Sequence, residues 1–270
     1  MRQYVDWSMP NHFLFICDAD TVIADNWMVN AKRVLATEEP PDAIGSVFFG
    51  GEHNGSMLQI CQSLEWIRYT NQILRSKKVF VLTGTASLIR AECFERIYEL
   101  RGYYYNEQSI TEDFTMTLDL KEVGTKMVSP LSCSCLTEMM PSWKLLFLQR
   151  RRWYLGALQQ IVQREWTQVM RPYLFQQLLL LISVFSFMLM ILFSIYLAFT
   201  GDMIFDLFWA MIGIIFMAER ITTVWTKGWH ARLFAALMIP ELIYSFILQI
   251  SYLDALRQLL MGSKGSWNHV

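Results

Sequence analysis

Three short polar segments contain the side chains of this 270-residue chain that could do chemistry. They are Asp18-Ala19-Asp20, Thr111-Glu112-Asp113 and Gln149-Arg150-Arg151-Arg152-Trp153. Carboxylates are hard oxygen ligands for Mg²⁺ or Mn²⁺, and they can also accept a proton from a hydroxyl group. An arginine binds phosphate through its planar fork, and a tryptophan offers an aromatic face to a sugar ring. These residue types indicate a site for a phosphorylated, sugar-containing ligand.

The first acidic pair follows an apolar run, His12–Cys17, whose composition predicts a buried strand. In open α/β sheets, ligands bind at the carboxyl ends of strands. On an extended chain Asp18 and Asp20 point the same way, so both can face one cation. We therefore expect Mg²⁺ or Mn²⁺ here, bridging a diphosphate. A chance acidic turn is the alternative, since such triplets are common.

A second predicted strand, Val79–Leu82, leads into the small polar segment Thr83-Gly84-Thr85, which continues to Ser87. Glycine lets a ligand approach the backbone closely, and hydroxyl groups can bond to a sugar. A simple turn is the alternative, and this segment taken alone favours the turn.

Glu112 and Asp113 open a predicted helix that ends near Gly124, with Thr111 in the capping position. Acidic residues in a first turn are stabilised by the helix dipole, which is a structural role. A catalytic base would fit equally well at this place. Periodicity does not choose between the two.

Gln149, Arg152 and Trp153 stand at i, i+3 and i+4 of an amphipathic helix that begins after Pro141, so they share one face. The alternative is a basic, aromatic helix lying at a membrane surface. That alternative explains Arg150, Arg151 and Trp166. It does not explain the alignment of an amide, a guanidinium and an indole.

The elements that must position these groups divide by composition. Ten of the 47 charged residues follow residue 172, and between Tyr173 and Ala218 only Asp202 and Asp206 are charged. We expect a domain over residues 1–140, an interfacial helix over 141–172, three transmembrane helices within 173–261, and a tail over 262–270.

The expected spans are Tyr173–Phe199, Met203–Ala218 and Leu233–Leu253, the last kinked at Pro240. Flanking basic residues place the first 172 residues in the cytosol, on a multi-pass protein of the cell membrane. The net charge of −1 excludes a nucleic-acid binder driven by a broad basic surface. The five scattered cysteines exclude a disulfide scaffold.

Taken in this order, the three polar segments and the apolar spans resemble the processive family 2 glycosyltransferases. These are the membrane synthases of cellulose, chitin, hyaluronan and poly-N-acetylglucosamine. The resemblance implies a GT-A-like, Rossmann-like α/β domain. It also implies inverting transfer from a nucleotide sugar, expected to be UDP-linked, to a growing β-linked polysaccharide.

The resemblance also assigns roles to the acidic segments. Asp18 and Asp20 would contact the nucleotide sugar and its divalent metal, with Asp20 the more direct ligand. Asp113 would be the general base that deprotonates the acceptor hydroxyl, with Glu112 beside it as support.

The remaining segments would hold the rest of the substrate. Gln149 and Arg152 would bind the diphosphate or the acceptor, Trp153 would stack on the acceptor sugar, and Thr83-Gly84-Thr85 would line the acceptor site. Polymer acceptor and lipid bilayer are thus the expected partners beside the nucleotide sugar.

The chain departs from this family at its start. Only 17 residues precede Asp18, where the family has the first half of its nucleotide-binding unit. We therefore expect a C-terminal portion of a synthase, with a second chain as a candidate source of the missing half-domain. A non-catalytic remnant or split-enzyme subunit, and an enzyme of single transfers to a lipid-linked acceptor, are the alternatives.

Overall fold

The computed structural model describes residues 11–52, 55–201, 207–225, 228–263 and 265. The chain forms two compact units. The first, here called the sheet unit, comprises Met1–Leu146 and Gly265–Val270, and the second, the helical unit, comprises Phe147–Lys264.

The sheet unit contains two small mixed sheets, with strand orders β1-β5-β3-β6 and β2-β7-β4. The strands are β1 (Phe13–Cys17), β2 (Val22–Ile23), β3 (Ala43–Gly45), β4 (Val47–Gly50), β5 (Ala86–Arg90), β6 (Met127–Val128) and β7 (Ser134–Thr137). β5 runs antiparallel to both of its neighbours, β1 and β3, whereas β3 pairs in parallel with β6. The α/β class predicted from the sequence is confirmed.

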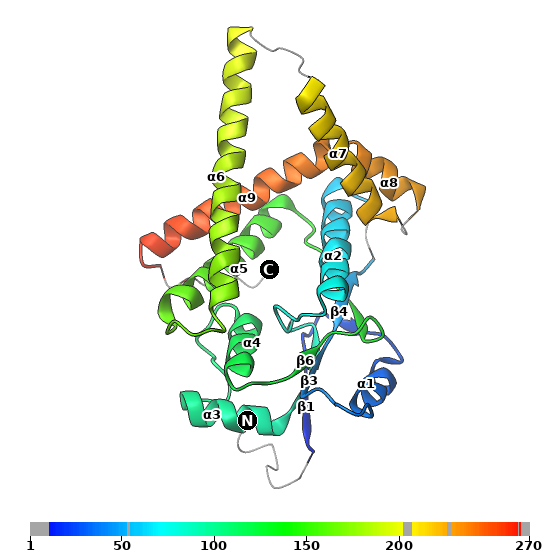
Figure 1. Ribbon diagram of the computed structural model, residues 1–270, viewed down its shortest axis with the longest axis vertical. Coiled ribbons are helices and arrows are strands. Elements are labelled where there is room, and N and C mark those ends of the chain that lie inside the picture. The colour runs from blue at the N-terminus through cyan, green and yellow to red at the C-terminus, as the bar shows by residue number, and fades with distance from the viewer. Residues whose placement is uncertain (1–10, 53–54, 202–206, 226–227, 264, 266–270) are drawn as a thin grey trace. The chain divides into compact units, whose positions relative to one another are not determined.

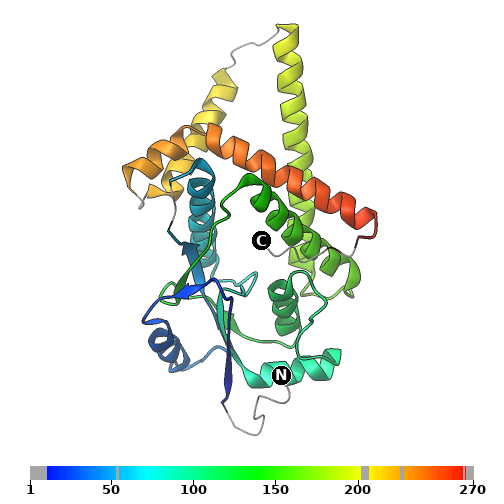
Figure 2. The same cartoon turned by 180° about the vertical axis from the view of Figure 1, so that it is seen from behind.

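Helices cover both faces of the larger sheet. They are α1 (Trp27–Leu35), α3 (Ala91–Arg101) and α4 (Glu112–Glu122), whereas α2 (Met57–Ser76) packs against β4 of the smaller sheet. In β3, Ala43 packs in one core cluster with α3 and α4, while its neighbour Ile44 packs in another with Trp27 of α1. Successive side chains of a strand point to opposite faces, so α1 lies on one side of the sheet and α3 and α4 lie on the other (Figures 1 and 2).

Two strand predictions were only partly right. The run that ends at Cys17 does form a strand, β1, but its side chains are exposed or half-buried rather than buried. The segment Val79–Leu82 is not a strand. Val79 and Leu82 are buried in the core, and the Leu82 N–H donates to the Thr117 hydroxyl at 2.8 Å instead of pairing with a strand. Apolar composition there reflects burial, which periodicity does not distinguish from sheet pairing.

The helical unit follows α5 (Trp143–Gln163), which crosses the boundary between the units. Its other helices are α6 (Arg171–Thr200), α7 (Leu207–Thr223), α8 (Trp229–Ala236) and α9 (Ile239–Leu260). Among the described residues, α6 is the one helix that by itself is long and apolar enough to cross a membrane. The α8–α9 pair qualifies only if its two helices, bent by 66° at the break, count as one span.

The predicted first span, Tyr173–Phe199, lies within α6. The predicted kink is present as a break at Met238, where φ is +54°, and Pro240 stands in the first turn of α9, where its missing N–H costs nothing. The start of the predicted second span and most of the tail lie outside the described residues. Three crossings therefore stay a prediction. In Figure 1, α9 runs across the direction of α6 rather than along it.

Candidate functional site

The antiparallel pairing of β1 with β5 brings the first two predicted site segments together. Cys17, the last residue of β1, is opposite Ala86, the first residue of β5. Beyond this pair the Asp18 N–H donates to the Gly84 carbonyl at 2.9 Å, and the Cys17 thiol donates to the Thr85 carbonyl at 3.1 Å. The end of β1 and the turn before β5 thus form one corner of the sheet.

Gly84 is required at this corner by the Asp18 carboxylate. A Cβ atom at position 84 would lie 2.8 Å from Asp18 Oδ1, which is closer than Cβ atoms approach other heavy atoms in proteins. The hydroxyls of Thr83 and Thr85 are 2.9 Å apart, and the Ser87 hydroxyl donates to the Thr83 carbonyl at 3.0 Å. The segment is a turn, which was the alternative favoured for this segment alone. Its glycine also leaves space for the carboxylate of Asp18.

The two carboxylates of the first acidic pair do not lie on an extended chain as predicted. The Thr21 N–H donates to the Asp18 carbonyl at 3.2 Å, which closes residues 18–21 into a turn. Burial raises the pKa of the Cys17 thiol, and the negative charges of Asp18 and Asp20 raise it further. The charges of both carboxylates therefore reach the Cys17 thiol, although the two residues belong to a turn and not to an extended strand.

The donor set of this corner fits a magnesium-like ion. Asp18 and Asp20 are both exposed and supply hard oxygen atoms. Mg²⁺ usually binds through one or two carboxylates together with substrate phosphates and water. Among the described residues no three His, Cys, Asp or Glu side chains gather as a metal cage. The corner accordingly suits an ion shared with a phosphorylated substrate.

Hydrogen bonds connect the first turn of α4 to the same corner. The Thr117 hydroxyl donates to the Asp113 carbonyl at 2.7 Å and accepts the Leu82 N–H at 2.8 Å. This bridge ties the helix turn that carries Asp113 to the segment that precedes Gly84. Thr117 was not among the predicted site residues, because its place in the helix reveals no partner.

The predicted acid pair at this turn has two different environments. Asp113 Oδ1 accepts the Phe114 N–H at 2.7 Å, which satisfies one first-turn donor. Thr111 stands in the predicted capping position, but its side chain makes no capping hydrogen bond, so that part of the capping alternative is wrong. Glu112 Oε2 is buried, and among the described residues it has no hydrogen-bond partner. A buried acceptor without a donor is costly, so this oxygen is a candidate contact for a ligand hydroxyl.

The acidic residues raise the pKa values of two nearby tyrosines. Burial raises the pKa of Tyr105, and the negative charges of Glu112, Asp113 and Asp18 raise it further. Burial and then Asp113 raise the pKa of Tyr69 to about 12. Because one phenol feels all three carboxylates, the two predicted acidic segments belong to one neighbourhood. Sequence reasoning had assigned neither tyrosine to the site.

The third segment lies in the helical unit, where two of its three consecutive arginines bond to side chains of α9. Arg150 is buried and donates to the Tyr244 hydroxyl at 3.3 Å, and Arg151 forms an ion pair with Asp254 at 3.2 Å. Arg152 contributes to neither of these contacts. These two groups therefore bond to another helix, and the location of the helix at a membrane surface stays a prediction.

Gln149 and Trp153 keep part of their predicted capacity for binding. Gln149 Oε1 is buried and, within the described part of the chain, accepts no hydrogen bond. The Trp153 side chain is 36% exposed, but the Arg150 guanidinium lies 4.4 Å from its ring centroid. One face of the indole is thus taken by a cation–π contact, which leaves the other face for a sugar. This group and the Asp18 corner belong to different compact units.

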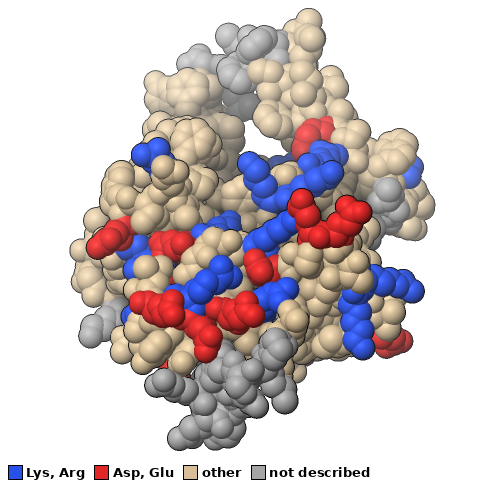
Figure 3. All heavy atoms as spheres, turned by 60° about the horizontal axis from the view of Figure 1, so that its bottom comes forward, with Lys and Arg blue, Asp and Glu red and all other residues tan. Residues whose placement is uncertain are grey.

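Charged side chains of both signs share the surface of the described residues. On the face drawn in Figure 3, Lys and Arg side chains lie among Asp and Glu side chains.

Comparison with known proteins gives one family. The family model described as "Glycosyl transferase family group 2" matches residues 14–248. A search of curated proteins finds no match. Among solved structures, the mannosyltransferase PcManGT from Pyrobaculum calidifontis, in complex with GDP-Man and Mn²⁺, matches at 13% identity with a TM-score of 0.49. The match covers 92% of this chain and 62% of that one.

Proposed function

The chain belongs to glycosyl transferase family group 2, and we propose that it takes part in inverting sugar transfer from a nucleotide sugar to a membrane-associated acceptor. The observation that carries the proposal is the convergence of Asp18, Gly84 and the first turn of α4 on one corner of the sheet unit. We assign a UDP sugar as donor and a growing β-linked polysaccharide as acceptor.

In this proposal Asp18 and Asp20 would hold a divalent ion, Mg²⁺ or Mn²⁺, which would supply positive charge to the departing diphosphate. Both carboxylates belong to the turn that the Thr21–Asp18 hydrogen bond closes. Gly84 keeps the space that the Asp18 carboxylate needs.

Asp113 accepts the proton of the acceptor hydroxyl as its oxygen attacks the anomeric carbon. The bond from that carbon to the diphosphate oxygen breaks on the opposite side, so the configuration inverts. Glu112 accepts a hydrogen bond from the acceptor through its unsatisfied Oε2. Tyr105 is protonated at neutral pH like any tyrosine, and burial beside three carboxylates raises its pKa further, so its hydroxyl serves as a hydrogen-bond donor among these carboxylates.

We assign Gln149 and Arg152 to the diphosphate or the acceptor, and the open face of Trp153 to the acceptor sugar. α6 anchors the protein in the cell membrane, and α7 and the α8–α9 pair complete three passes, with the sheet unit in the cytosol. The long, exposed apolar surface of α6 supports the anchor.

The test is sugar transfer in membranes of the producing organism, with the gene replaced by each variant. Asp113→Asn should reduce transfer at least 10³-fold, roughly the contribution of general base catalysis, while nucleotide-sugar binding persists. Asp25 is an exposed carboxylate that follows the turn of residues 18–21. Asp25→Asn is the matched control and should keep wild-type activity. An active Asp113→Asn protein would refute the assignment of the base, and product length would separate polymer synthesis from single transfer.

A further inference from the structure

A shallow hollow lies within the helical unit where α5 ends and α6 begins. Its lining comes from the end of α5, the connecting loop and the first turn of α6. The lining residues are Ile161, Arg164, Glu165, Trp166, Thr167, Met170, Arg171 and Leu174. The mechanism above uses none of them.

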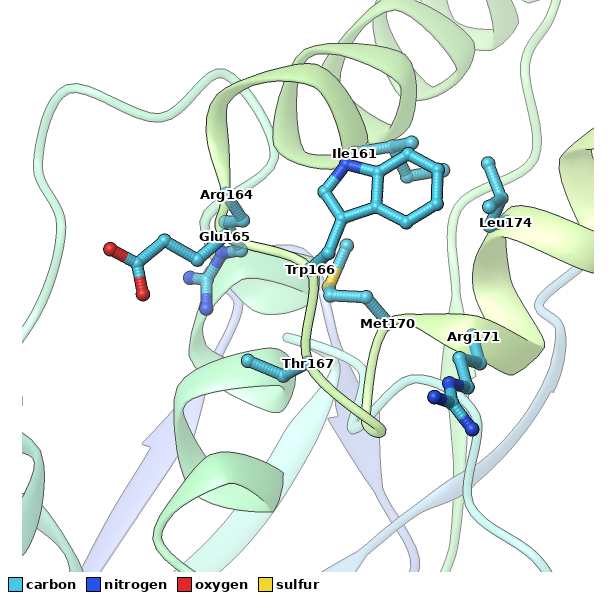
Figure 4. A pocket seen from close by; sticks show the side chains of 8 residues that line it. All are labelled: Ile161, Arg164, Glu165, Trp166, Thr167, Met170, Arg171 and Leu174. Carbon is cyan, nitrogen blue, oxygen red and sulfur yellow. The ribbon is translucent and has the colours of Figure 1, made fainter.

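The hollow combines an apolar floor with two guanidinium groups. In Figure 4 the indole of Trp166 lies over Ile161 and Met170, with Arg164 on one side and Arg171 on the other. Trp166 is 83% exposed, which is costly in water for so large an apolar surface. Arg164 is held at Nε by Gln160 Oε1 at 2.8 Å, which fixes the position of its guanidinium.

Charge and polarity together define the ligand that fits. Two arginines against one carboxylate leave the hollow with a net positive charge, and in Figure 4 the Glu165 carboxylate points away from the indole. Arginine forks suit phosphate oxygens, whereas the apolar floor suits an acyl or glycerol group. A free phosphate would leave the floor and the indole uncovered.

The position of the hollow indicates where such a ligand comes from. Arg171 is the first residue of α6, whose apolar surface is almost entirely exposed. Tryptophan and arginine at the end of a membrane helix lie at the level of the lipid headgroups. If α6 is an anchor, as the proposed function holds, the hollow opens at the phosphate level of the bilayer.

We propose that this hollow is a binding site for the phosphate headgroup of an anionic phospholipid, with Arg164 and Arg171 holding the phosphate and Trp166 covering the glycerol and upper acyl region. The inference rests on the membrane anchor of the proposed function, but not on the transfer chemistry. It gives the protein a preference for anionic bilayers.

The test uses the full chain reconstituted in vesicles. Quenching of tryptophan fluorescence by brominated phosphatidylglycerol is compared with quenching by brominated phosphatidylcholine, and Trp166→Phe identifies the contribution of this indole. Binding of phosphatidylglycerol should be about tenfold or more tighter than that of phosphatidylcholine. Arg164→Gln/Arg171→Gln should remove the difference, since each basic side chain near an anionic surface contributes roughly a factor of five.

Two controls make the outcomes decisive. Arg33→Gln/Arg75→Gln removes the same charge from exposed positions of the sheet unit and should keep the preference. Equal quenching by both lipids, or full competition by millimolar inorganic phosphate, would overturn the lipid site while leaving the anchor intact. Failure of the chain to associate with vesicles of either composition would instead refute the anchor, and with it the premise of the site.

Discussion

Among single residues, Gly84 makes the sharpest link between sequence and site. From the sequence, Gly84 is only a flexible turn residue. In the structure, an oxygen of the Asp18 carboxylate lies where a side chain at position 84 would begin. Asp18 is short and exposed, so it can move away when that space is filled. The consequence of a substitution here is therefore displacement of a site residue rather than unfolding.

Gly84→Ala is expected to resemble Asp18→Ala in activity. Transfer should fall about 10–100-fold, as for other losses of support around a metal site, while the free energy of unfolding changes by about 1 kcal/mol or less. Kinetic assays at varied Mn²⁺ together with thermal unfolding test both parts. Gly51→Ala, whose Cβ would meet only an ordinary 3.5 Å contact, should be neutral, and a fully active Gly84→Ala enzyme would show that the close approach of Gly84 to Asp18 is not needed for transfer.

Lys121 gives the sheet unit a pH dependence of its own. Burial lowers the pKa of Lys121 to about 8, below the value of about 10.4 in an unfolded chain. The unfolded state binds more protons between these values, so this contribution to stability is fully present above about pH 10.4 and is lost as the pH falls through 8.

Replacing this residue isolates its contribution. The free energy of unfolding of wild type minus that of Lys121→Met should rise between pH 8 and about 10.4 by ~1 kcal/mol, the full shift being reduced because the amine is partly exposed. Denaturant titrations across this range measure it. A flat difference would show that the Lys121 amine is solvated as in the unfolded chain.

Among the elements, α5 owes its orientation to α9. Arg150 and Arg151 bond to Tyr244 and Asp254, and the rings of Tyr154 and Tyr252 meet edge to face with centroids 5.3 Å apart. These contacts fix the rotation of α5 about its axis.

Breaking the ion pair should loosen this arrangement. Arg151→Met is expected to lower the stability of the helical unit by roughly 1.5–3 kcal/mol, the range for hydrogen bonds to charged groups. Thermal unfolding in detergent measures the effect, with Arg75→Met on α2 as an exposed control. Arg151→Lys should restore part of the loss. Equal stability of all three variants would show that the Asp254 pair does not hold α5.

For the whole molecule, the decisive property is the division between a charged sheet unit and an apolar helical unit. α6 exposes large apolar side chains along its length, including Phe175 at 61% and Leu189 at 65%. In water this surface would drive aggregation, whereas in a bilayer it is solvated by lipid.

Leu189→Arg places a charge near the middle of α6. Insertion should become less favourable by about 2.5–3.5 kcal/mol, so a larger fraction of the protein should be released from membranes by alkaline carbonate. Leu189→Ala serves as the control and should stay in the membrane pellet. Complete release of the unmodified protein would contradict the anchor itself.

The sequence by itself determined the composition-driven features. Apolar length predicted α6, the missing donor of Pro240 predicted the break before α9, and the polar segments identified Asp18, Glu112, Asp113 and Gln149 as candidates. These features depend on local physics: helical rise, backbone hydrogen bonding and side-chain chemistry. They do not require knowledge of which segments meet.

Only the tertiary structure decided which of these groups lie near one another. The antiparallel pairing of β1 with β5 brought Asp18 to Gly84, and the Thr117 bridge tied Asp113 to the same corner. Tyr105 belongs to another loop, but the charges of Glu112, Asp113 and Asp18 raise its pKa. Such neighbourhoods arise from pairings between residues far apart in the chain, and local periodicity carries no information about those pairings.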